Sequence, residues 1–188
     1  MKILLHACCG PCSIFPVKEL TEQGHDLTGY FYNPNIHPYT EFRKRLETFE
    51  QYVEKTGLPV IIDSEYELDE FLRGVSFREG DRCRICYGMR LRRAARVAKK
   101  GGFDAFSSTL LVSPMQKHDL IKDIGEAAGE EMGIPFYYHD FRPGYREGVR
   151  ISREEQMYRQ QYCGCIYSER DRHLPLKKAG KNQELKKQ

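Results

Sequence analysis

The sequence predicts an α/β fold in which helices cover both faces of a doubly wound, mainly parallel sheet of about five strands. Short apolar runs alternate with amphipathic stretches along the chain, as they do in successive βαβ units. Glycines follow several of the amphipathic stretches, which is where helices commonly end. Strands that alternate with helices in this way pair in parallel, because each helix carries the chain back to the same edge of the sheet.

The first half of the chain contains three expected strands and two expected helices. We expect strands at residues 1–7, 26–32 and 59–63 and helices at 13–23 and 40–56. The second helix has the clearest pattern, because its apolar residues recur at i, i+4, i+7 and i+11 and so share one face: Phe42, Leu46, Phe49 and Val53. Gly24 and Gly57 directly follow the two helices and predict where they end.

The second half continues the alternation. Leu91, Ala95 and Ala98 mark one face of a helix that ends at Gly101. We further expect strands at 103–111 and 134–140, and a helix at 115–132 that Gly133 closes. The sequence SREE at 152–155 matches a capping box, in which the first and last side chains cap the helix backbone, and it predicts the start of a last helix.

The length suits one compact domain. The chain has 188 residues, of which 40% are hydrophobic, and no run of 18 apolar residues that could span a membrane. We therefore expect a single α/β domain at 1–174, with no membrane partner. The N-terminus lacks the apolar region and cleavage site of a secretory leader, so we expect a cytoplasmic protein. Residues 175–188 are predicted to form a basic, flexible tail.

A parallel arrangement of the predicted strands gathers polar side chains at one edge of the sheet. In doubly wound sheets, ligands bind outside the carboxyl ends of the strands. The residues that follow the strands are Cys8, Cys9, Asn33, Asn35, His37, Thr109, Ser113, Asp140 and Arg142. The Rossmann glycine motif and the P-loop are both absent. The Gly-Gly-x-Asp loop of ATP pyrophosphatases, which have a similar Rossmann-like sheet, is absent too, so the sequence does not support ATP or NAD binding.

Seven cysteines form three tight groups, at residues 8, 9 and 12, at 83 and 86, and at 163 and 165. In a reducing cytosol, clustered cysteines are more often metal ligands or catalytic groups than structural disulfides. Two thiolates from each of the first two groups would make a four-cysteine site for a tetrahedral zinc ion or a 4Fe–4S cluster. The spacing leaves open which metal binds and which two of Cys8, Cys9 and Cys12 are ligands.

The first group also contains CGPC, the dithiol sequence of thioredoxins, after a strand and before a helix. A thiol–disulfide oxidoreductase of that kind is therefore one alternative function. Against it, Cys8 is redundant for a dithiol, the residue before Cys9 is not the Trp usual in thioredoxins, and the other cysteines would need a separate explanation. A zinc-binding module that binds RNA is a second alternative.

The last group, Cys163-Gly164-Cys165, can close only a very small disulfide ring. Such a ring is strained and readily reduced, as labile or catalytic disulfides are. Two further metal ligands are the alternative interpretation. Three tyrosines flank the pair and could pack in the core or stack on a nucleobase: Tyr158, Tyr162 and Tyr167.

Positive charge is concentrated although the net charge is only +3. Residues 82–100 carry eight Lys or Arg side chains and no acidic residue, and the last twelve residues carry five Lys and one Glu. Patches of this kind favour a polyanionic partner such as a nucleic acid. The alternative is a solvated helix face and a frayed tail.

Six stretches together resemble the QueH-type epoxyqueuosine reductases. They are LLHACCGPCS (4–13), FYNPNIHPYTEFRKR (31–45), RCRICYGMRL (82–91), FSSTLLVSPMQKHDLI (106–121), YYHDFRPGY (137–145) and YRQQYCGCIYS (158–168). They run in family order, and the cysteine pattern shows no departure from that of the family. The resemblance covers about 165 residues and excludes the tail.

The resemblance implies the last step of queuosine synthesis, in which the epoxide oxygen of epoxyqueuosine at the tRNA wobble position is removed without cobalamin. It implies a 4Fe–4S cluster with four ligands: Cys8, Cys9, Cys83 and Cys86. It implies a redox-active pair at Cys163 and Cys165. Cys12 has no settled role and is a candidate ligand of a single adjacent iron. The electron donor is unidentified.

The predicted position of other side chains suggests further roles in that reaction. His37, Asp140 and Tyr87 are candidate proton donors, and Tyr32 and Tyr39 are candidates to stack on a base that is flipped out of the anticodon loop. The basic residues after the second cysteine group could contact tRNA phosphates: Arg90, Arg92, Arg93, Arg96, Lys99 and Lys100.

Overall fold

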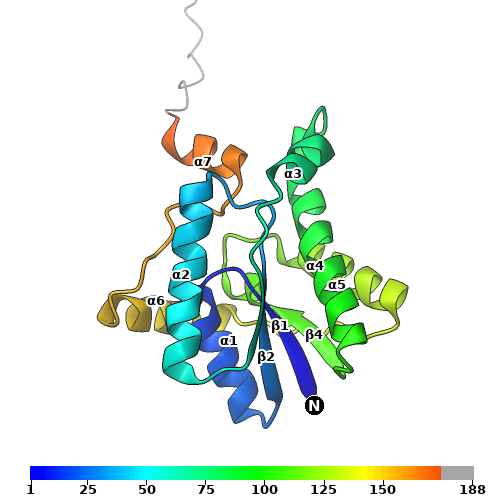
Figure 1. The fold of residues 1–188 in the computed structure, drawn as a ribbon, viewed down its shortest axis with the longest axis vertical. Helices are drawn as coiled ribbons and strands as arrows, with labels where there is room; N and C mark the ends of the chain where they lie inside the picture. The colour runs from blue at the N-terminus through cyan, green and yellow to red at the C-terminus, as the bar shows by residue number, and fades with distance from the viewer. Residues whose placement is uncertain (175–188) are drawn as a thin grey trace, which may run out of the picture.

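The fold is a four-stranded parallel sheet with helices on both faces (Figure 1). The computed structural model describes residues 1–174. The strands are β1 (Lys2–Ala7), β2 (Asp26–Tyr32), β3 (Val60–Asp63) and β4 (Ala105–Ser108). Their order across the sheet is β3-β2-β1-β4, so the direction of strand addition reverses beside β1. In the interior strand β1, Leu4 pairs with Thr28 of β2 on one side and with Phe106 of β4 on the other.

That reversal distributes the helices over the two faces. The helices are α1 (Gly10–Glu22), α2 (Tyr39–Thr56), α3 (Leu68–Val75), α4 (Arg82–Lys100), α5 (His118–Met132), α6 (Tyr145–Glu154) and α7 (Ile166–His173). Since βαβ crossovers are right-handed, α1 and α2 pack on one face and α4 and α5 on the other. Helix α3 packs against α4, and α6 against α1. The predicted α/β class with helices on both faces is confirmed.

The core surrounds β1, which is buried on both faces. Ile3, Leu4 and Leu5 are almost fully inaccessible to solvent. Continuous apolar sequence of this kind is typical of a parallel strand covered by helices on both sides. A second cluster, which includes Phe31 and Phe49, fills the space under α2. The predicted ends of α2 and α5 are also observed, because Gly57 and Gly133 both adopt the left-handed conformation that closes a helix.

The prediction of a fifth strand at 134–140 is wrong. This segment forms a single bridge between Phe136 and Phe106, in which Phe106 N–H donates to Pro135 and Tyr137 N–H donates to Phe106. Directly afterwards, Tyr138 N–H donates to the carbonyl of Phe136 at 3.1 Å, which turns the chain away from the sheet edge. The fourth strand is also shorter than 103–111, because Ser108 Oγ accepts from Leu110 N–H and starts a 3₁₀ turn, Thr109–Val112.

The capping-box prediction at 152–155 is wrong as well. These residues lie at the end of α6, which begins at Tyr145. Ser152 Oγ donates back to the carbonyl of Val149 instead of capping a following turn. The motif is too short to distinguish the first turn of a helix from the last, since Ser side chains also bond to carbonyls inside helices. Helix α3 was not predicted, and α1 begins at Gly10, with a proline in its first turn.

Within residues 1–174, no helix is both long enough and apolar enough to cross a bilayer. The predicted tail, 175–188, lies outside the described residues.

Gly10 sets how closely α1 approaches α2. A Cβ atom at this position would lie 2.7 Å from the carbonyl oxygen of Thr48 and 2.8 Å from Met157 Cε. The first of these atoms belongs to the helix backbone and cannot rotate away. The absence of a side chain therefore allows the start of α1, and the cysteines around it, to lie directly against α2.

We expect Gly10→Ala to lower the free energy of unfolding by about 1–3 kcal/mol, because the added methyl group forces two backbones apart. Urea denaturation of the metal-free protein measures the effect. Gly80→Ala is the matched control, since a Cβ atom there meets nothing within 4 Å. Equal stability of the two variants would contradict the packing argument.

Candidate metal centre

The reversal of strand order beside β1 places the first cysteines at the carboxyl edge of the sheet, between β1 and β4. Cys8 follows β1 and Thr109 follows β4, and the backbone N–H of Cys8 donates to Thr109 Oγ1 at 3.1 Å. Ligands of doubly wound folds bind in the crevice at such a reversal. His6, two residues before Cys8 on β1, is fully buried and forms hydrogen bonds with Ser108 Oγ at 2.8 Å and with the carbonyl of Tyr32 at 3.0 Å.

Three thiols meet at this edge. The Sγ atoms of Cys8, Cys9 and Cys12 all lie within 4.8 Å of one another, and those of Cys8 and Cys9 are 3.9 Å apart. Hydrogen bonds from Cys12 and Cys9 hold the pKa of Cys8 well below its usual range, whereas the pKa values of the other two thiols are raised. The group therefore favours one thiolate stabilised by two thiols. Thiolates at this separation could bind a metal ion.

Gln160 connects this group to the far end of the chain. Its Nε2 atom lies 3.3 Å from Cys12 Sγ, and its Oε1 atom accepts from Cys9 Sγ at 3.4 Å. Gln160 lies in the stretch YRQQYCGCIYS, but nothing in the local sequence marks it as a contact of the first cysteine group. A glutamine matches no metal-binding or catalytic sequence motif, and Gln160 is 148 residues from Cys12 along the chain. Only the fold therefore reveals the contact.

The second cysteine group lies on the first turns of α4. Cys83 and Cys86 are three residues apart and therefore share one helix face. Cys86 is buried, and Asn35 Nδ2 donates to its sulfur at 3.0 Å. Burial raises the pKa of Cys86 to about 12, with a smaller opposing effect from the positive charge of Arg90. Repulsion from the other thiolates, those of Cys163, Cys165 and Cys83, would raise it further.

Arg90 carries a positive charge in the interior, with only 1% of its surface exposed. Its Nε donates to Asn35 Oδ1 at 2.7 Å, and its Nη2 has no hydrogen-bond partner. Within residues 1–174 it makes no salt bridge. The sequence suggests Arg90 as a contact for tRNA phosphates, but its burial keeps it away from the surface, so that suggestion is wrong. A buried anion such as a metal–thiolate group would balance this charge, so Arg90 fits the implied cluster. Among the cysteines of residues 1–174, however, only Cys8, Cys9 and Cys12 form a group of three whose sulfurs lie within 4.8 Å of one another, and Cys83 and Cys86 lie outside that group.

Cys163 and Cys165 lie on a loop that a second buried arginine holds. Arg45 Nη1 and Nη2 donate to the carbonyls of Cys163 and Tyr162, both at 2.9 Å, and its Nε donates to Glu41 at 2.7 Å. Gly164 has φ 144°, a value that L side chains rarely adopt. Cys163 is exposed, Cys165 is buried, and all seven cysteines are free thiols.

The first and third cysteine groups face one cavity of about 300 Å³. Its lining includes Cys8, Cys12, Gln116, Gln160 and Cys163. Gln116 Nε2 donates to Cys163 Sγ at 3.2 Å, while its Oε1 accepts from Tyr87 Oη at 2.6 Å. A ligand in this cavity would therefore contact thiols from both ends of the chain.

The candidate proton donors lie elsewhere. Asp140 is paired with Arg142, whose hydrogen bonds lower the pKa of Asp140 to about 2 and keep the carboxylate ionised. Burial and the charge of Arg90 lower the pKa of His37 to about 4, and both ring nitrogens lack hydrogen-bond partners. Neither side chain lines the cavity. Burial raises the pKa of Tyr87 above its usual range.

The proposed stacking tyrosines differ in exposure. Tyr32 is buried, and its hydroxyl donates to Glu67 at 2.8 Å. The side chain of Tyr39 is 53% exposed, so it alone of the two is open to a nucleobase.

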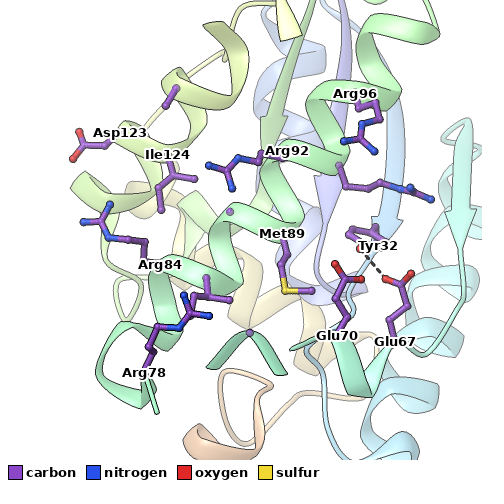
Figure 2. Close-up of a pocket in the computed structure, with 15 residues that line it drawn as sticks. Tyr32, Glu67, Glu70, Arg78, Arg84, Met89, Arg92, Arg96, Asp123 and Ile124 are labelled. Carbon is purple, nitrogen blue, oxygen red and sulfur yellow. Dashed lines mark hydrogen bonds between the residues drawn. The ribbon is translucent and has the colours of Figure 1, made fainter. Parts of the chain in front are cut away.

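The exposed part of the basic stretch borders a separate groove of about 670 Å³ between α3, α4 and α5 (Figure 2). Five arginines line it: Arg78, Arg84, Arg92, Arg93 and Arg96. Glu67 and Glu70 lie opposite them, with Asp123 at the other end. Arg92 pairs with Glu131 and Arg93 with Asp63. Lys99 instead donates to the carbonyl of Gly133, and neither Lys99 nor Lys100 lines the groove.

Comparison with known proteins identifies relatives over most of the chain. The family model described as Epoxyqueuosine reductase QueH matches residues 3–171. The epoxyqueuosine reductase QueH of Dehalococcoides mccartyi is 42% identical over 171 residues, which span 91% of this chain and 94% of the relative. That of Thermotoga maritima is 36% identical over 190 residues, with 93% and 95% coverage.

A solved structure shares the fold. It is described as a predicted subunit of tRNA methyltransferase from Methanocaldococcus jannaschii, and it superposes with a TM-score of 0.51 over 81% of this chain and 75% of its own. The two sequences are 12% identical, so the likeness concerns the fold alone.

We expect acid to destabilise the metal-free protein through His37. Its pKa is about 4 in the folded state and 6.5 when unfolded, so below pH 6.5 the unfolded chain binds a proton that the folded chain does not. The free energy of unfolding therefore decreases as the pH falls from 6.5 toward 4. The decrease due to His37 amounts to about 2 kcal/mol at pH 5. His37→Phe, which suits the neighbouring rings of Tyr66 and Phe71, should lose correspondingly less stability between pH 7 and 5. Urea denaturation measures the difference.

The exposed His173 supplies the control for this comparison. His173→Phe should keep the pH dependence of the unmodified protein. If His37→Phe keeps it too, His37 is not the buried neutral group.

Proposed function

This chain belongs to the QueH family of epoxyqueuosine reductases, and we propose that it removes the epoxide oxygen of epoxyqueuosine at the tRNA wobble position to give queuosine. Members of the family are oxidoreductases. The observation that carries the proposal is the cavity that Cys8, Cys12 and Cys163 share, since thiols from the proposed metal site and from the proposed redox pair line the same space of about 300 Å³.

The reaction requires two electrons and two protons. Both C–O bonds of the epoxide break, a carbon–carbon double bond forms, and the oxygen leaves as water. Oxidation of Cys163 and Cys165 to a disulfide releases two electrons and two protons, so this dithiol balances the reaction. No further proton donor is then required, which agrees with the positions of His37 and Asp140 away from the cavity. An external electron donor, not yet identified, would reduce the disulfide again.

The metal centre would be held by Cys8, Cys9, Cys83 and Cys86 as a 4Fe–4S cluster, without cobalamin. When bound, such a group supplies electrons one at a time and could polarise the epoxide oxygen through an adjacent iron. Cys12 would be a ligand of that iron. Gln160 contacts the sulfurs of Cys9 and Cys12 and would fix their orientation, as hydrogen-bonding groups around metal ligands commonly do.

The dithiol is oriented by its neighbours. Tyr87 donates to Gln116, so the amide presents its N–H group to Cys163 Sγ, where it would stabilise a thiolate. Arg45 donates to the carbonyls of Tyr162 and Cys163, which belong to the two peptide groups on either side of the Cys163 Cα atom. Cys163, the exposed thiol, would therefore be the one that meets substrate.

The tRNA would bind along the arginine groove. Arg92, Arg93 and Arg96 line it and are accessible, and Lys99 and Lys100 continue the positive charge along α4. Arginine and lysine side chains neutralise backbone phosphates, and the modified base would leave the anticodon-loop stack to reach the cavity.

We expect protein purified without oxygen to be brown and to contain about four acid-labile sulfides per chain, with about four irons for the cluster alone and one more if the adjacent iron is bound. Metal analysis and visible spectra measure this, and Cys86→Ser should lose the colour. A colourless protein with one zinc ion per chain would instead favour the zinc-binding alternative.

We expect Cys163→Ser to retain the iron and the colour but to lose turnover, because the remaining thiol cannot form the intramolecular disulfide. Single-turnover conversion of epoxyqueuosine in tRNA, followed by nucleoside analysis, measures the loss. Iron content confirms in each preparation that the metal centre is intact. Normal turnover by this variant would exclude the dithiol as the electron source.

We expect the double variant Arg92→Ala, Arg96→Ala to bind the anticodon stem-loop more weakly and with a smaller salt dependence, since each phosphate contact removed lowers the slope of log affinity against log salt by roughly 0.7–0.9. Arg43→Ala is the control, because Arg43 is an exposed arginine on α2 that pairs with Glu47. Equal slopes for both proteins would place the tRNA on another surface.

A further inference from the structure

Two arginines are fully buried at the carboxyl edge of the sheet, and they differ in what surrounds their charge. Arg45 pairs with the carboxylate of Glu41 at 2.7 Å and donates to two carbonyls. Arg90 has a neutral amide, Asn35, as its hydrogen-bond partner and leaves Nη2 without one. Burial of an uncompensated guanidinium is costly. Arg90 therefore needs a nearby negative charge, which Arg45 already has in Glu41.

The groups around Arg90 do not supply a permanent negative charge. Its positive charge acts on His6, His37, Cys8 and Cys86. Histidine side chains carry no negative charge in either protonation state, and within residues 1–174 Arg90 has no carboxylate in salt-bridge contact. The anionic partners within reach are therefore the cysteine sulfurs of the metal centre.

The hydrogen bonds around Arg90 have only one possible direction. A guanidinium group has donors and no acceptor, so Asn35 must present its Oδ1 to Arg90. The amide nitrogen then faces the other way and donates to Cys86 Sγ at 3.0 Å. Asn35 itself is 1% exposed, and the neighbouring Asn33 ties the same loop to the carbonyl of Ala7 at 3.0 Å. Arg90 thus aims an N–H donor at a ligand sulfur and places its own charge behind it.

We propose that Arg90 and Asn35 form a positioning pair that raises the reduction potential of the metal–sulfur group by stabilising its more negative, reduced form. The inference rests on the metal centre proposed above. Net charge and hydrogen bonds to sulfur are two of the factors that set the potential of such groups, and this pair supplies both at Cys86.

The test is a redox titration of anaerobically purified, iron-loaded protein, followed by visible and electron paramagnetic resonance spectra. Arg90→Met should shift the reduction equilibrium at least ten-fold toward the oxidised form, which is about 59 mV for one electron. Arg90→Lys keeps the charge and should shift the equilibrium less. Arg92→Met is the control, because it removes the same charge from an exposed position on the same helix, and it should leave the potential unchanged.

A second variant tests the hydrogen bond and does not depend on the first. Asn35→Asp retains a partner for Arg90 but neutralises its charge and removes the N–H donor to Cys86. The potential should therefore fall, with the reduction equilibrium shifted at least ten-fold toward the oxidised form. If Arg90→Met fails to assemble the metal centre while Arg90→Lys assembles it, the need for a cation is supported. Unchanged potentials in Asn35→Asp and in whichever Arg90 variants assemble the centre would overturn the inference. Absence of iron and sulfide from the unmodified protein would instead overturn the proposed metal centre itself.

Discussion

The C-terminal cysteine loop has no regular secondary structure, and a buried guanidinium, together with the backbone N–H of His37, attaches it to the sheet domain. Arg45 uses one edge of its planar group to bind Glu41 and the other to bind the carbonyls of Tyr162 and Cys163. Charge-assisted bonds of this kind are stronger than neutral ones, and the nearby carboxylate offsets the cost of burying the charge. Gly164 packs against the same guanidinium, where a Cβ atom would lie 3.2 Å from Nη1. The position of Cys163 therefore depends on α2.

Parallel topology provides the other half of the site. The chain enters the sheet edge at Cys8, after β1, and again at Thr109, after β4, and the two are hydrogen-bonded. Since β1 is an interior strand that is covered on both faces, the residues that follow it, Cys8 and Cys9, are buried. Hydrogen bonds with Cys12 and Cys8, together with shielding from water, raise the pKa of Cys9, so a metal ion bound there would have to displace its proton.

The sequence predictions were correct for elements that local interactions determine and wrong for elements that depend on contacts elsewhere in the fold. Helix α2 and its end at Gly57 were correct because the apolar period and the left-handed glycine are local properties. The segment 134–140 has the composition of a strand, yet the turn at Tyr138 prevents it from pairing beyond Phe136. Ser152 in SREE was misread for the same reason, because its hydrogen-bond partner depends on where α6 begins.

The sequence alone determined the α/β class, the three cysteine groups and the concentration of positive charge on one helix, because periodicity, spacing and composition are written in adjacent residues. Only the tertiary structure decided which of those side chains meet. It placed Gln160 between Cys9 and Cys12, held the loop of Cys163 against Arg45, and buried Arg90 away from the basic surface to which its neighbours belong. These contacts join residues far apart in the chain, and they depend on strand order and helix packing, which no local pattern encodes.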